Sequence, residues 1–340
     1  MTELRFAMFG AGFWAPFQLT GWREAGGVRC VALYNRTRAK AEELARRLEI
    51  PAVYDDPEGL LEGEELDFVD VCTNVETHAR FVRLAADRGL PVVCQKPMAT
   101  SIEKAEEMVA YCREAGVAFY INENWRWQRP IREFKRILNH GRIGAPFRAR
   151  IEYCNSFPVF ETQPFLKEIE QFILTDIGSH ILDTARFLFG EAHSLSCLTN
   201  QVTPGIKGED VATVMMRMGE DVTVTCEMSY ASRTEHERFP QTYIFVEGSR
   251  GSLELNVDFW IRETTEAGTL AKRYPPERKT WAEPPCYDLT HDAIVLCQKN
   301  LSRALRGEEE AETTGEDNLN TMRLVFGAYE SARSRRTLRL

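Results

Sequence analysis

The chain has 340 residues, of which 44% are hydrophobic and 27% are charged, a composition typical of globular proteins and unlike that of disordered chains. Its formal net charge is −9 and its basic residues are scattered, so no electrostatic footprint for nucleic acid is present. This length suits two domains better than one. We therefore expect a two-domain globular protein without a nucleic-acid partner.

No apolar run approaches the roughly 20 residues that span a bilayer, and no apolar signal segment opens the chain. The sequence therefore predicts a cytoplasmic protein without a membrane partner. The nine cysteines form no Cys-x-x-Cys pair, and several of them lie inside apolar, strand-like runs. This pattern favours buried, reduced thiols over disulfides or a zinc site.

The first third of the chain alternates short apolar runs with longer segments that carry apolar residues at helical spacing. This alternation predicts a parallel, doubly wound sheet, that is, an α/β Rossmann dinucleotide-binding domain over residues 1–124. The predicted strands are 4–9, 28–34, 67–72, 91–95 and 117–121, and the predicted helices are 40–48, 77–88 and 101–114.

After a helix predicted at 129–139, strands follow strands, which indicates a second domain over residues 125–340. We expect an α+β C-terminal domain with an open, mostly antiparallel sheet that binds substrate and supports oligomerisation. Gly248–Gly251 is a turn-forming segment that suits a hairpin. The predicted strands are 147–153, 211–218, 222–230, 242–247 and 252–256, the predicted helices are 172–189, 291–306 and 318–334, and the proline-rich stretch 274–285 predicts a surface loop.

A glycine-rich segment follows the first predicted strand. Residues 10–15 read Gly-Ala-Gly-Phe-Trp-Ala and match the G-x-G-x-x-A pattern. Gly10 permits a tight turn, Gly12 lets the backbone approach a pyrophosphate, and the following helix N-terminus favours negative charge. At the start of a βαβ pattern this predicts NAD or NADP binding, with Phe13 and Trp14 beside the cofactor. The alternative is a generic α/β turn.

The end of the second predicted strand carries Asn35 and Arg36 where an acidic residue usually binds the ribose of NAD. Asn35 suits a ribose hydroxyl, whereas Arg36 suits a 2′-phosphate. The residues therefore favour neither NAD nor NADP. For Arg36 the alternative is a solvated residue in a strand-end turn.

Three further groups carry candidate chemistry. Lys96 ends a buried strand, at the sheet edge where ligands bind, although most lysines are only solvated. Asp176 and His180 are four residues apart, hence on one helical face, and suit a proton-transfer pair, although such pairs are more often structural. Asp183 lies one turn further along; it is expected either on the helix surface or as a residue that supports the pair without contacting the substrate. No convincing third ligand accompanies Asp176 and His180, so we expect no metal.

The segment after the fifth predicted strand reads Asn-Glu-Asn-Trp-Arg-Trp. Carboxylate, amide and guanidinium groups bind hydroxyls, and indoles cover apolar ring faces, so this mixture favours a wall of a sugar pocket. The alternative is an interdomain linker whose tryptophans pack. The candidate substrate-binding residues are Lys96, Glu123, Asn124, Arg126, Trp127, Asp176 and His180.

Several motifs, in this order along the chain, resemble the Gfo/Idh/MocA oxidoreductase family. They are the G-x-G-x-x-A start, Thr73-Asn74 with His78, Gln95-Lys96-Pro97, and Asp176-x-Gly178-x-His180-x-x-Asp183. The likeness spans the whole chain. It departs at Gln95, because the family pattern is Glu-Lys-Pro.

The resemblance implies that Lys96, Asp176 and His180 form a catalytic trio. His180 would act as the general base, Lys96 would support the proton shift and the cofactor, and Asp176 would position substrate and base. Thr73, Asn74 and His78 would line the nicotinamide half of the cofactor, with Gln95 nearby.

Within the family, the chain looks most like the bacterial branch that oxidises the branched pentose D-apiose to its lactone with NAD. The resemblance thus implies an NAD(P)-dependent oxidoreductase acting on a sugar, and it favours a dimer or tetramer. Two alternatives remain: another polyol, inositol or aldose dehydrogenase of the same fold, and a regulator that binds NAD(P) without turnover.

Overall fold

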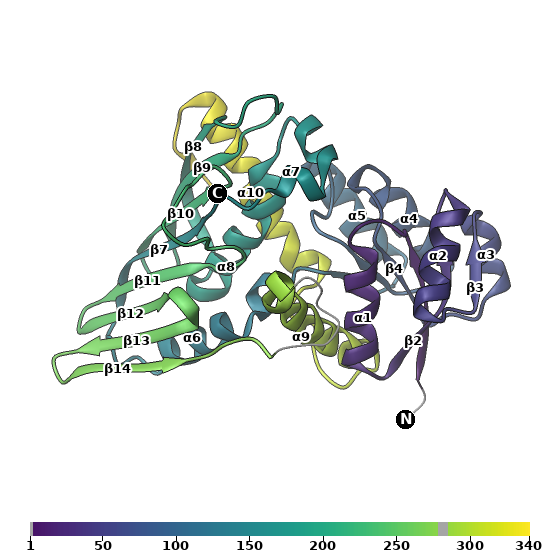
Figure 1. Ribbon diagram of the computed structural model, residues 1–340, viewed down its shortest axis with the longest axis horizontal. Helices are drawn as coiled ribbons and strands as arrows, with labels where there is room; N and C mark the ends of the chain where they lie inside the picture. The colour runs from purple at the N-terminus through teal and green to yellow at the C-terminus, as the bar shows by residue number, and fades with distance from the viewer. Residues whose placement is uncertain (1–2, 278–284) are drawn as a thin grey trace. The chain divides into compact units, whose positions relative to one another are not determined.

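The computed structural model describes residues 3–277 and 285–340 (Figure 1). Most of the proline-rich stretch that was predicted as a surface loop, residues 278–284, lies outside the described residues. The chain folds into two compact units, Met1–Asn124 with Ile294–Met322 and Trp125–Ala293 with Arg323–Leu340.

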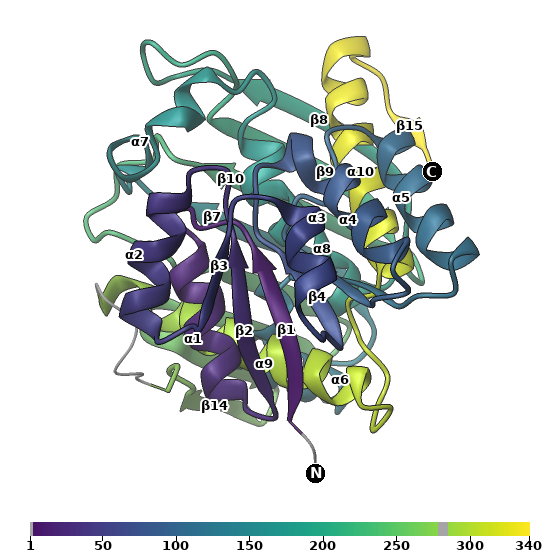
Figure 2. The same cartoon turned by 90° about the vertical axis from the view of Figure 1, so that its right-hand side faces the viewer.

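The first unit contains a six-stranded sheet in the order β3-β2-β1-β4-β5-β6, with parallel pairing throughout (Figure 2). The strand order reverses between β1 and β4, the place where doubly wound sheets bind ligands. The predicted Rossmann fold is confirmed; β3 and α3 were not predicted. The strands are β1 (Leu4–Phe9), β2 (Val28–Tyr34), β3 (Ala52–Tyr54), β4 (Phe68–Val71), β5 (Val92–Cys94) and β6 (Phe119–Ile121), and the helices are α1 (Ala15–Ala25), α2 (Arg38–Leu48), α3 (Pro57–Gly63), α4 (His78–Ala86) and α5 (Ile102–Glu114).

The second unit contains a nine-stranded sheet in the order β14-β13-β12-β11-β7-β10-β9-β8-β15. Its pairings are antiparallel except between β7 and β10, so the predicted mostly antiparallel sheet is confirmed. The strands are β7 (Pro146–Cys154), β8 (Ala192–Asn200), β9 (Val211–Met218), β10 (Val222–Ser229), β11 (Tyr243–Gly248), β12 (Gly251–Asn256), β13 (Trp260–Thr265), β14 (Gly268–Arg273) and β15 (Leu338–Arg339).

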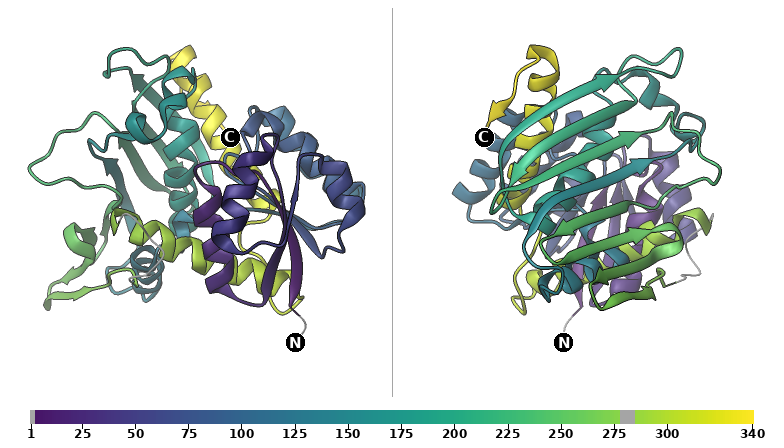
Figure 3. Two further views of the ribbon diagram at one scale, coloured as in Figure 1. Left: turned by 45° about the vertical axis from the view of Figure 1, so that its right-hand side comes forward. Right: turned by 90° about the vertical axis from the view of Figure 1, so that its left-hand side faces the viewer.

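One face of this sheet carries the core of the second unit. Helix α8 (Ser179–Phe189) packs against β7 and β10, and α6 (Arg129–Asn139) packs against β12. Burial alternates along β9, where Val214 and Met216 are buried whereas Thr213, Met215 and Arg217 are exposed. The right-hand view of Figure 3 shows the opposite face, which no helix of the described residues covers.

The segment predicted as one helix over 172–189 is not regular. It contains a π-helical turn, Leu174–Gly178, followed by α8. The turn places Asp176 outside regular α-helical geometry, so the four-residue spacing to His180 does not carry its usual α-helical meaning. Shorter helical segments precede it at α7 (Val159–Thr162) and Pro164–Glu168.

The last two helices, α9 (Asp288–Leu305) and α10 (Gly315–Ser334), each contribute residues to both units. We predicted that all residues from 125 onward belong to the second domain, whereas the structure groups Ile294–Met322 with the first unit. Hydrogen bonds tie this segment to the first unit: Gln298 Nε2 donates to Gln18 O at 3.1 Å, and Thr313 O accepts from Ile121 N at 2.8 Å.

All nine cysteines lie within the described residues and are free thiols. Among the described residues, no helix has the length and apolar character needed to cross a membrane.

Candidate active site

The loop between β1 and α1 requires glycine at position 10. Gly10 has a φ of +115°, and its N–H donates to Tyr34 O at 2.7 Å. A Cβ at this position would lie 2.2 Å from Cys72 O, a carbonyl of the backbone. Because neither the dihedral nor the space admits a side chain, the tight turn depends on this glycine.

Gly12 lies in open space. A Cβ built on Gly12 meets no protein atom within 4 Å, so packing within the protein does not require glycine there. Three residues after Gly12 the chain enters α1, whose first turn contains Pro16 and no acidic residue. An open glycine backbone before an acid-free helix N-terminus fits a pyrophosphate, and these residues therefore suit a dinucleotide.

Two aromatic side chains continue this loop. Phe13 is 41% exposed, and its ring lies 5.7 Å from that of Phe17. Trp14 lies 5.2 Å from Phe17, and its Nε1 is buried without a hydrogen-bond partner among the described residues. The predicted cofactor contact at Phe13 thus has an accessible side chain.

Asn35 and Arg36 follow β2. Asn35 Oδ1 accepts from Ala11 N at 3.2 Å, and its Nδ2 donates to Thr37 O at 2.9 Å. The side chain thereby ties the end of β2 to the glycine loop. Arg36 is exposed.

His78 is a buried link between two loops. Its ring is 1% exposed, with Nε2 3.1 Å from Thr73 O and Nδ1 3.3 Å from Met98 O. Burial lowers its pKa, which favours the neutral ring. These contacts connect the loop after β4 with the loop after β5. Of the three residues predicted to line the cofactor, Asn74 is exposed and Thr73 is half-buried.

Lys96 follows β5 and is half-buried. Its backbone N–H donates to Gln95 Oε1 at 3.3 Å, and a cis peptide bond joins it to Pro97. Gln95 is buried and donates from Nε2 to Gln18 Oε1 at 3.1 Å. The glutamine that departs from the expected Glu-Lys-Pro pattern therefore has a defined place in a hydrogen-bond chain.

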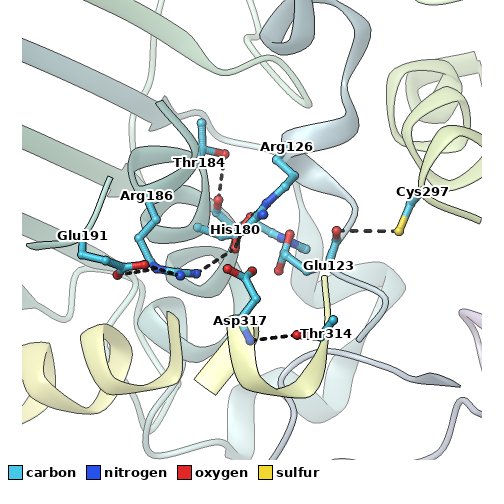
Figure 4. Close-up of polar contacts among 10 residues, drawn as sticks. Glu123, Arg126, His180, Thr184, Arg186, Glu191, Cys297, Thr314 and Asp317 are labelled. Atoms are coloured by element: carbon cyan, nitrogen blue, oxygen red, sulfur yellow. Dashed lines mark hydrogen bonds and ion pairs between the residues drawn. The ribbon is translucent and has the colours of Figure 1, made fainter. Parts of the chain in front are cut away.

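Glu123 and Asn124 end the first segment of the first unit, and both are buried. Glu123 O accepts a bond from Cys297 Sγ at 3.8 Å (Figure 4). Asn124 Oδ1 has no hydrogen-bond partner among the described residues. A buried amide oxygen without a partner fits the predicted role in binding a hydroxyl.

His180 of the second unit stacks on an indole. The rings of His180 and Trp125 lie 4.6 Å apart at an interplanar angle of 20°. Trp125 Nε1 donates to Thr242 Oγ1 at 2.8 Å. His180 O accepts from Thr184 Oγ1 at 2.9 Å (Figure 4). The indole of Trp125 thus packs against one face of the imidazole.

Asp176 is bound by a tyrosine. Tyr230, directly after β10, donates its hydroxyl to Asp176 Oδ2 at 3.2 Å. Burial raises the pKa of Tyr230 and of Tyr153, with a further contribution from the charge of Asp176. Both phenols therefore stay protonated, and that of Tyr230 donates to Asp176. Tyr230 was not predicted as a site residue; it lies within a predicted strand, and its residue type and its position at the strand end were the only signals. Trp125 was predicted only as part of the segment 122–127, without a role of its own.

Arg126 has a buried carboxylate partner. Its Nε and one terminal nitrogen donate to Asp183 at 2.7 and 2.5 Å, and both side chains are buried. The option that Asp183 lies on the helix surface is therefore wrong. Arg186, on the same helix as Asp183, binds Glu191, which follows the end of that helix, at 2.6 Å (Figure 4). Trp127 is also buried, and the Arg132 guanidinium lies 4.5 Å from its ring.

Each unit thus gathers part of the predicted set. The first unit brings together the glycine loop, Asn35, Thr73, His78 and the Gln95–Lys96 segment, and it also contains Glu123 and Asn124. The second unit carries Asp176 and His180, with Arg126 and Trp127 in the segment before α6.

Comparison with known proteins identifies the family of the chain. A family model described as "Oxidoreductase family, NAD-binding Rossmann fold" matches residues 4–123, and one described as "GFO/IDH/MocA C-terminal domain" matches residues 131–254. A D-apiose dehydrogenase of Paraburkholderia graminis is 39% identical over 98% of this chain and 89% of its own length. The chain belongs to the Gfo/Idh/MocA family.

Two further relatives match nearly end to end. A D-apiose dehydrogenase of Rhizobium rhizogenes is 36% identical over 99% of this chain and 98% of its own length. The crystal structure of an oxidoreductase from Agrobacterium radiobacter in complex with NAD+, L-tartaric acid and magnesium is 36% identical, with a TM-score of 0.97 over 99% of this chain and 98% of that chain.

Membership of the Gfo/Idh/MocA family confirms the resemblance read from the sequence. It makes this protein an NAD(P)-dependent oxidoreductase that acts on CH–OH groups, with the glycine loop in its NAD-binding domain. The predicted fold, enzyme class and cofactor are therefore confirmed.

Proposed function

We propose that this Gfo/Idh/MocA oxidoreductase oxidises D-apiose to D-apionolactone with NAD. The observation that carries the proposal is the similarity to two D-apiose dehydrogenases over 98% and 99% of the chain. Because such similarity includes both units, it extends to the segments that carry Lys96, Asp176 and His180.

In the proposed reaction His180 is the general base. It takes the proton of the anomeric hydroxyl while the anomeric C–H bond breaks and the C–O bond becomes the lactone carbonyl. NAD, when bound, supplies the hydride acceptor. The stacked Trp125 supports this role of His180, because an aromatic face stabilises the cationic ring that results.

The other two members of the trio position the sugar and stabilise the charge that develops on its oxygen. Asp176, which accepts a bond from Tyr230, orients the sugar and the base. Lys96 contributes positive charge beside the oxygen that loses its proton. Holding the reacting groups in line lowers the activation barrier by about 7–11 kcal/mol in well-aligned cases, so orientation is a large part of the catalytic effect.

The residues that would hold NAD belong to the first unit. The loop Gly10–Trp14 would take the pyrophosphate, and Asn35 and Arg36 would face the adenosine ribose. Thr73 and Asn74 would approach the nicotinamide half of NAD. His78 would fix their loop through its bond to Thr73 O, and Gln95 and Lys96 would lie beside the nicotinamide half. Glu123, Asn124, Arg126 and Trp127 remain proposed sugar contacts; Arg126 also binds the buried Asp183, and Trp127 contacts Arg132.

We also propose a homo-oligomer, a dimer or tetramer, that associates through the uncovered face of the nine-stranded sheet. Cross-strand pairing lines up Ser196, Met215, Thr225, Arg150 and Phe245 in one row across this face. A row with both apolar and polar members suits a protein interface. The proposed setting is the cytoplasm, which the nine free thiols support.

The test is to follow NADH and NADPH formation with D-apiose, common aldoses, inositols and sugar acids. We expect turnover of D-apiose with NAD. Turnover of another polyol instead would refute the substrate, whereas tight NAD binding without turnover of any substrate would favour a regulator that only binds the cofactor.

His180→Ala tests the proposed base. We expect turnover to fall about 100- to 10,000-fold while NAD affinity, measured by titration, stays within about twofold. His140→Ala, which alters an exposed histidine of the same unit, is the control and should retain full activity. Equal activity of the His180 variant and the control would remove His180 from the mechanism.

A further inference from the structure

A buried carboxylate in the first unit has no part in the proposed reaction. Asp70 lies in β4 with 0% exposure. Its Oδ2 accepts from Trp22 Nε1 at 2.5 Å and from Gln18 Nε2 at 3.0 Å, and its Oδ1 accepts from Asn122 Nδ2 at 3.3 Å. All three partners are neutral donors.

The bonding continues from Asp70 to the backbone of Lys96. Gln18 donates to Asp70 and accepts, at Oε1, from Gln95 Nε2 at 3.1 Å. Gln95 in turn accepts, at Oε1, from Lys96 N at 3.3 Å. Every donor in this chain points toward Asp70, so the two side-chain amides are aligned head to tail.

Asp70 determines the direction of the chain. An ionised carboxylate only accepts hydrogen bonds, so Gln18 must present its nitrogen to Asp70 and its oxygen to Gln95. Gln95 must then present its oxygen to Lys96. Bonds that end on an ionised acceptor are also stronger than bonds between neutral groups.

None of the described groups that contact Asp70 carries a charge that would compete with its carboxylate. The groups that face it are Gln18 and Trp22 of α1, Asn122 after β6, and the thiols of Cys30, Cys72 and Cys94. Burial raises the pKa of Asp70 to about 6, opposed by its three hydrogen bonds. The group is therefore mostly ionised above neutral pH.

We propose that Asp70 is a positioning residue that, through Gln18 and Gln95, fixes the backbone of Lys96 at the end of β5. The inference rests on the proposed role of Lys96 in the reaction. It also explains the glutamine at position 95: a glutamate there would face Gln18 Oε1 and add a second buried charge to the chain.

Gln18→Met breaks the chain with little change in volume. We expect kcat to fall about 5- to 10-fold, the effect of losing one or two hydrogen bonds, while NAD affinity and the KM for the sugar stay within about twofold. In protein labelled with 15N-lysine, with NAD bound, the amide signal of Lys96, assigned with Lys96→Arg, should shift.

Trp22→Phe is the matched control. It removes a donor from the same Asp70 oxygen but leaves the link between Gln18, Gln95 and Lys96 intact. This variant should lower the melting temperature without moving the Lys96 signal or kcat. If both variants shift the signal equally, or if neither does, Asp70 does not position Lys96.

Gln95→Glu tests the charge argument. Alone it should lower kcat and stability; combined with Asp70→Asn it should recover part of both losses, because only one buried charge remains. If the losses in kcat of the two single variants simply multiply in the double variant, the proposed coupling between position 95 and Asp70 is wrong. If the wild type turns over no sugar, the proposed function fails, whereas the Lys96 signal still decides whether the chain positions this residue.

Discussion

Gly10 and Gly12 lie two residues apart in one loop, yet the structure assigns them different requirements. Gly10 is required by the protein itself, because its φ of +115° and the nearby carbonyl of Cys72 exclude a side chain. Gly12 has open space around it, so only a bound ligand would require glycine there.

This difference predicts opposite behaviour for two alanine variants. Gly10→Ala should lower the free energy of unfolding by at least about 1–3 kcal/mol, because of backbone strain and the close approach of Cys72 O. Gly12→Ala should unfold at the wild-type temperature but bind NAD more weakly. Thermal unfolding and NAD titration of both variants test this, and unaltered NAD binding by Gly12→Ala would remove the pyrophosphate from this loop.

Asp70 gives the protein a pH dependence of known sign. Burial raises its pKa to about 6, whereas an unfolded aspartate titrates near about 3.9. Between these values the folded state binds more protons than the unfolded state, so stability falls as the pH rises. Asp70→Asn lacks this titration. From pH 4 to 7 the wild type should therefore lose up to about 3 kcal/mol of stability relative to Asp70→Asn, as measured by urea unfolding. Parallel pH profiles of the two proteins would contradict this.

At the residue scale, the sequence allowed prediction of the residue types that carry chemistry better than of their partners. The glycine loop and Lys96 were recognisable because their positions at strand ends follow from the sheet. The bond of Arg126 to Asp183 joins residues 57 positions apart, and no local pattern reports such a pair.

At the element scale, Glu209 holds the segment that carries Asp176. Its two carboxylate oxygens accept from Phe172 N at 3.3 Å and Leu174 N at 3.2 Å, and Tyr329 donates to it at 2.7 Å. The backbone N–H groups at the start of the irregular helix are thereby satisfied, as a capping residue would satisfy them.

Glu209→Ala should therefore destabilise the protein by about 1–3 kcal/mol, because it leaves donors in this segment without partners. It should also lower kcat, since the π-helical turn with Asp176 loses its anchor. Tyr329→Phe removes only one of the three bonds and should lower both the stability and kcat by less. A Tyr329 variant as impaired as the Glu209 variant would assign the effect to α10 instead.

The central strands of the first sheet were predicted best, whereas β8, β13, β14 and β15 of the second sheet were not predicted. Strands 4–9 and 28–34 were predicted to the residue, because central parallel strands are continuous apolar runs. β14 was missed because it is an edge strand with every residue exposed. The π-helical turn was missed because its apolar residues fit ordinary helical spacing.

At the scale of the whole molecule, the uncovered sheet face predicts association. Met215 lies within this face and is 52% exposed, and Leu198 on the neighbouring strand β8 is also exposed. Met215→Glu should shift the protein toward the monomer in light scattering, because a buried charge disfavours an interface. Val202→Glu alters a similarly exposed residue outside the sheet and should leave the mass unchanged. A wild-type monomer would contradict the proposed assembly.

The fold class of both units was predictable from the alternation of strands and helices, but the return of the chain to the first unit was not. Residues 294–322 read as ordinary amphipathic helix and connection. Their membership depends on bonds such as Gln298 to Gln18, which join residues 280 positions apart. Contacts of this length leave no signal in local periodicity.

The return of Ile294–Met322 to the first unit sets a rule for exchanging parts between relatives. A chimera that takes only residues 1–124 from a donor would pair the donor's α1 with a foreign α9, at the place where a Cβ on Gly21 would lie 2.3 Å from Gln298 Oε1 and 2.5 Å from Ile294 Cγ2. The first unit is therefore built from two separate pieces of the chain, and a recombination event that moves one piece without the other should yield a poorly folded protein.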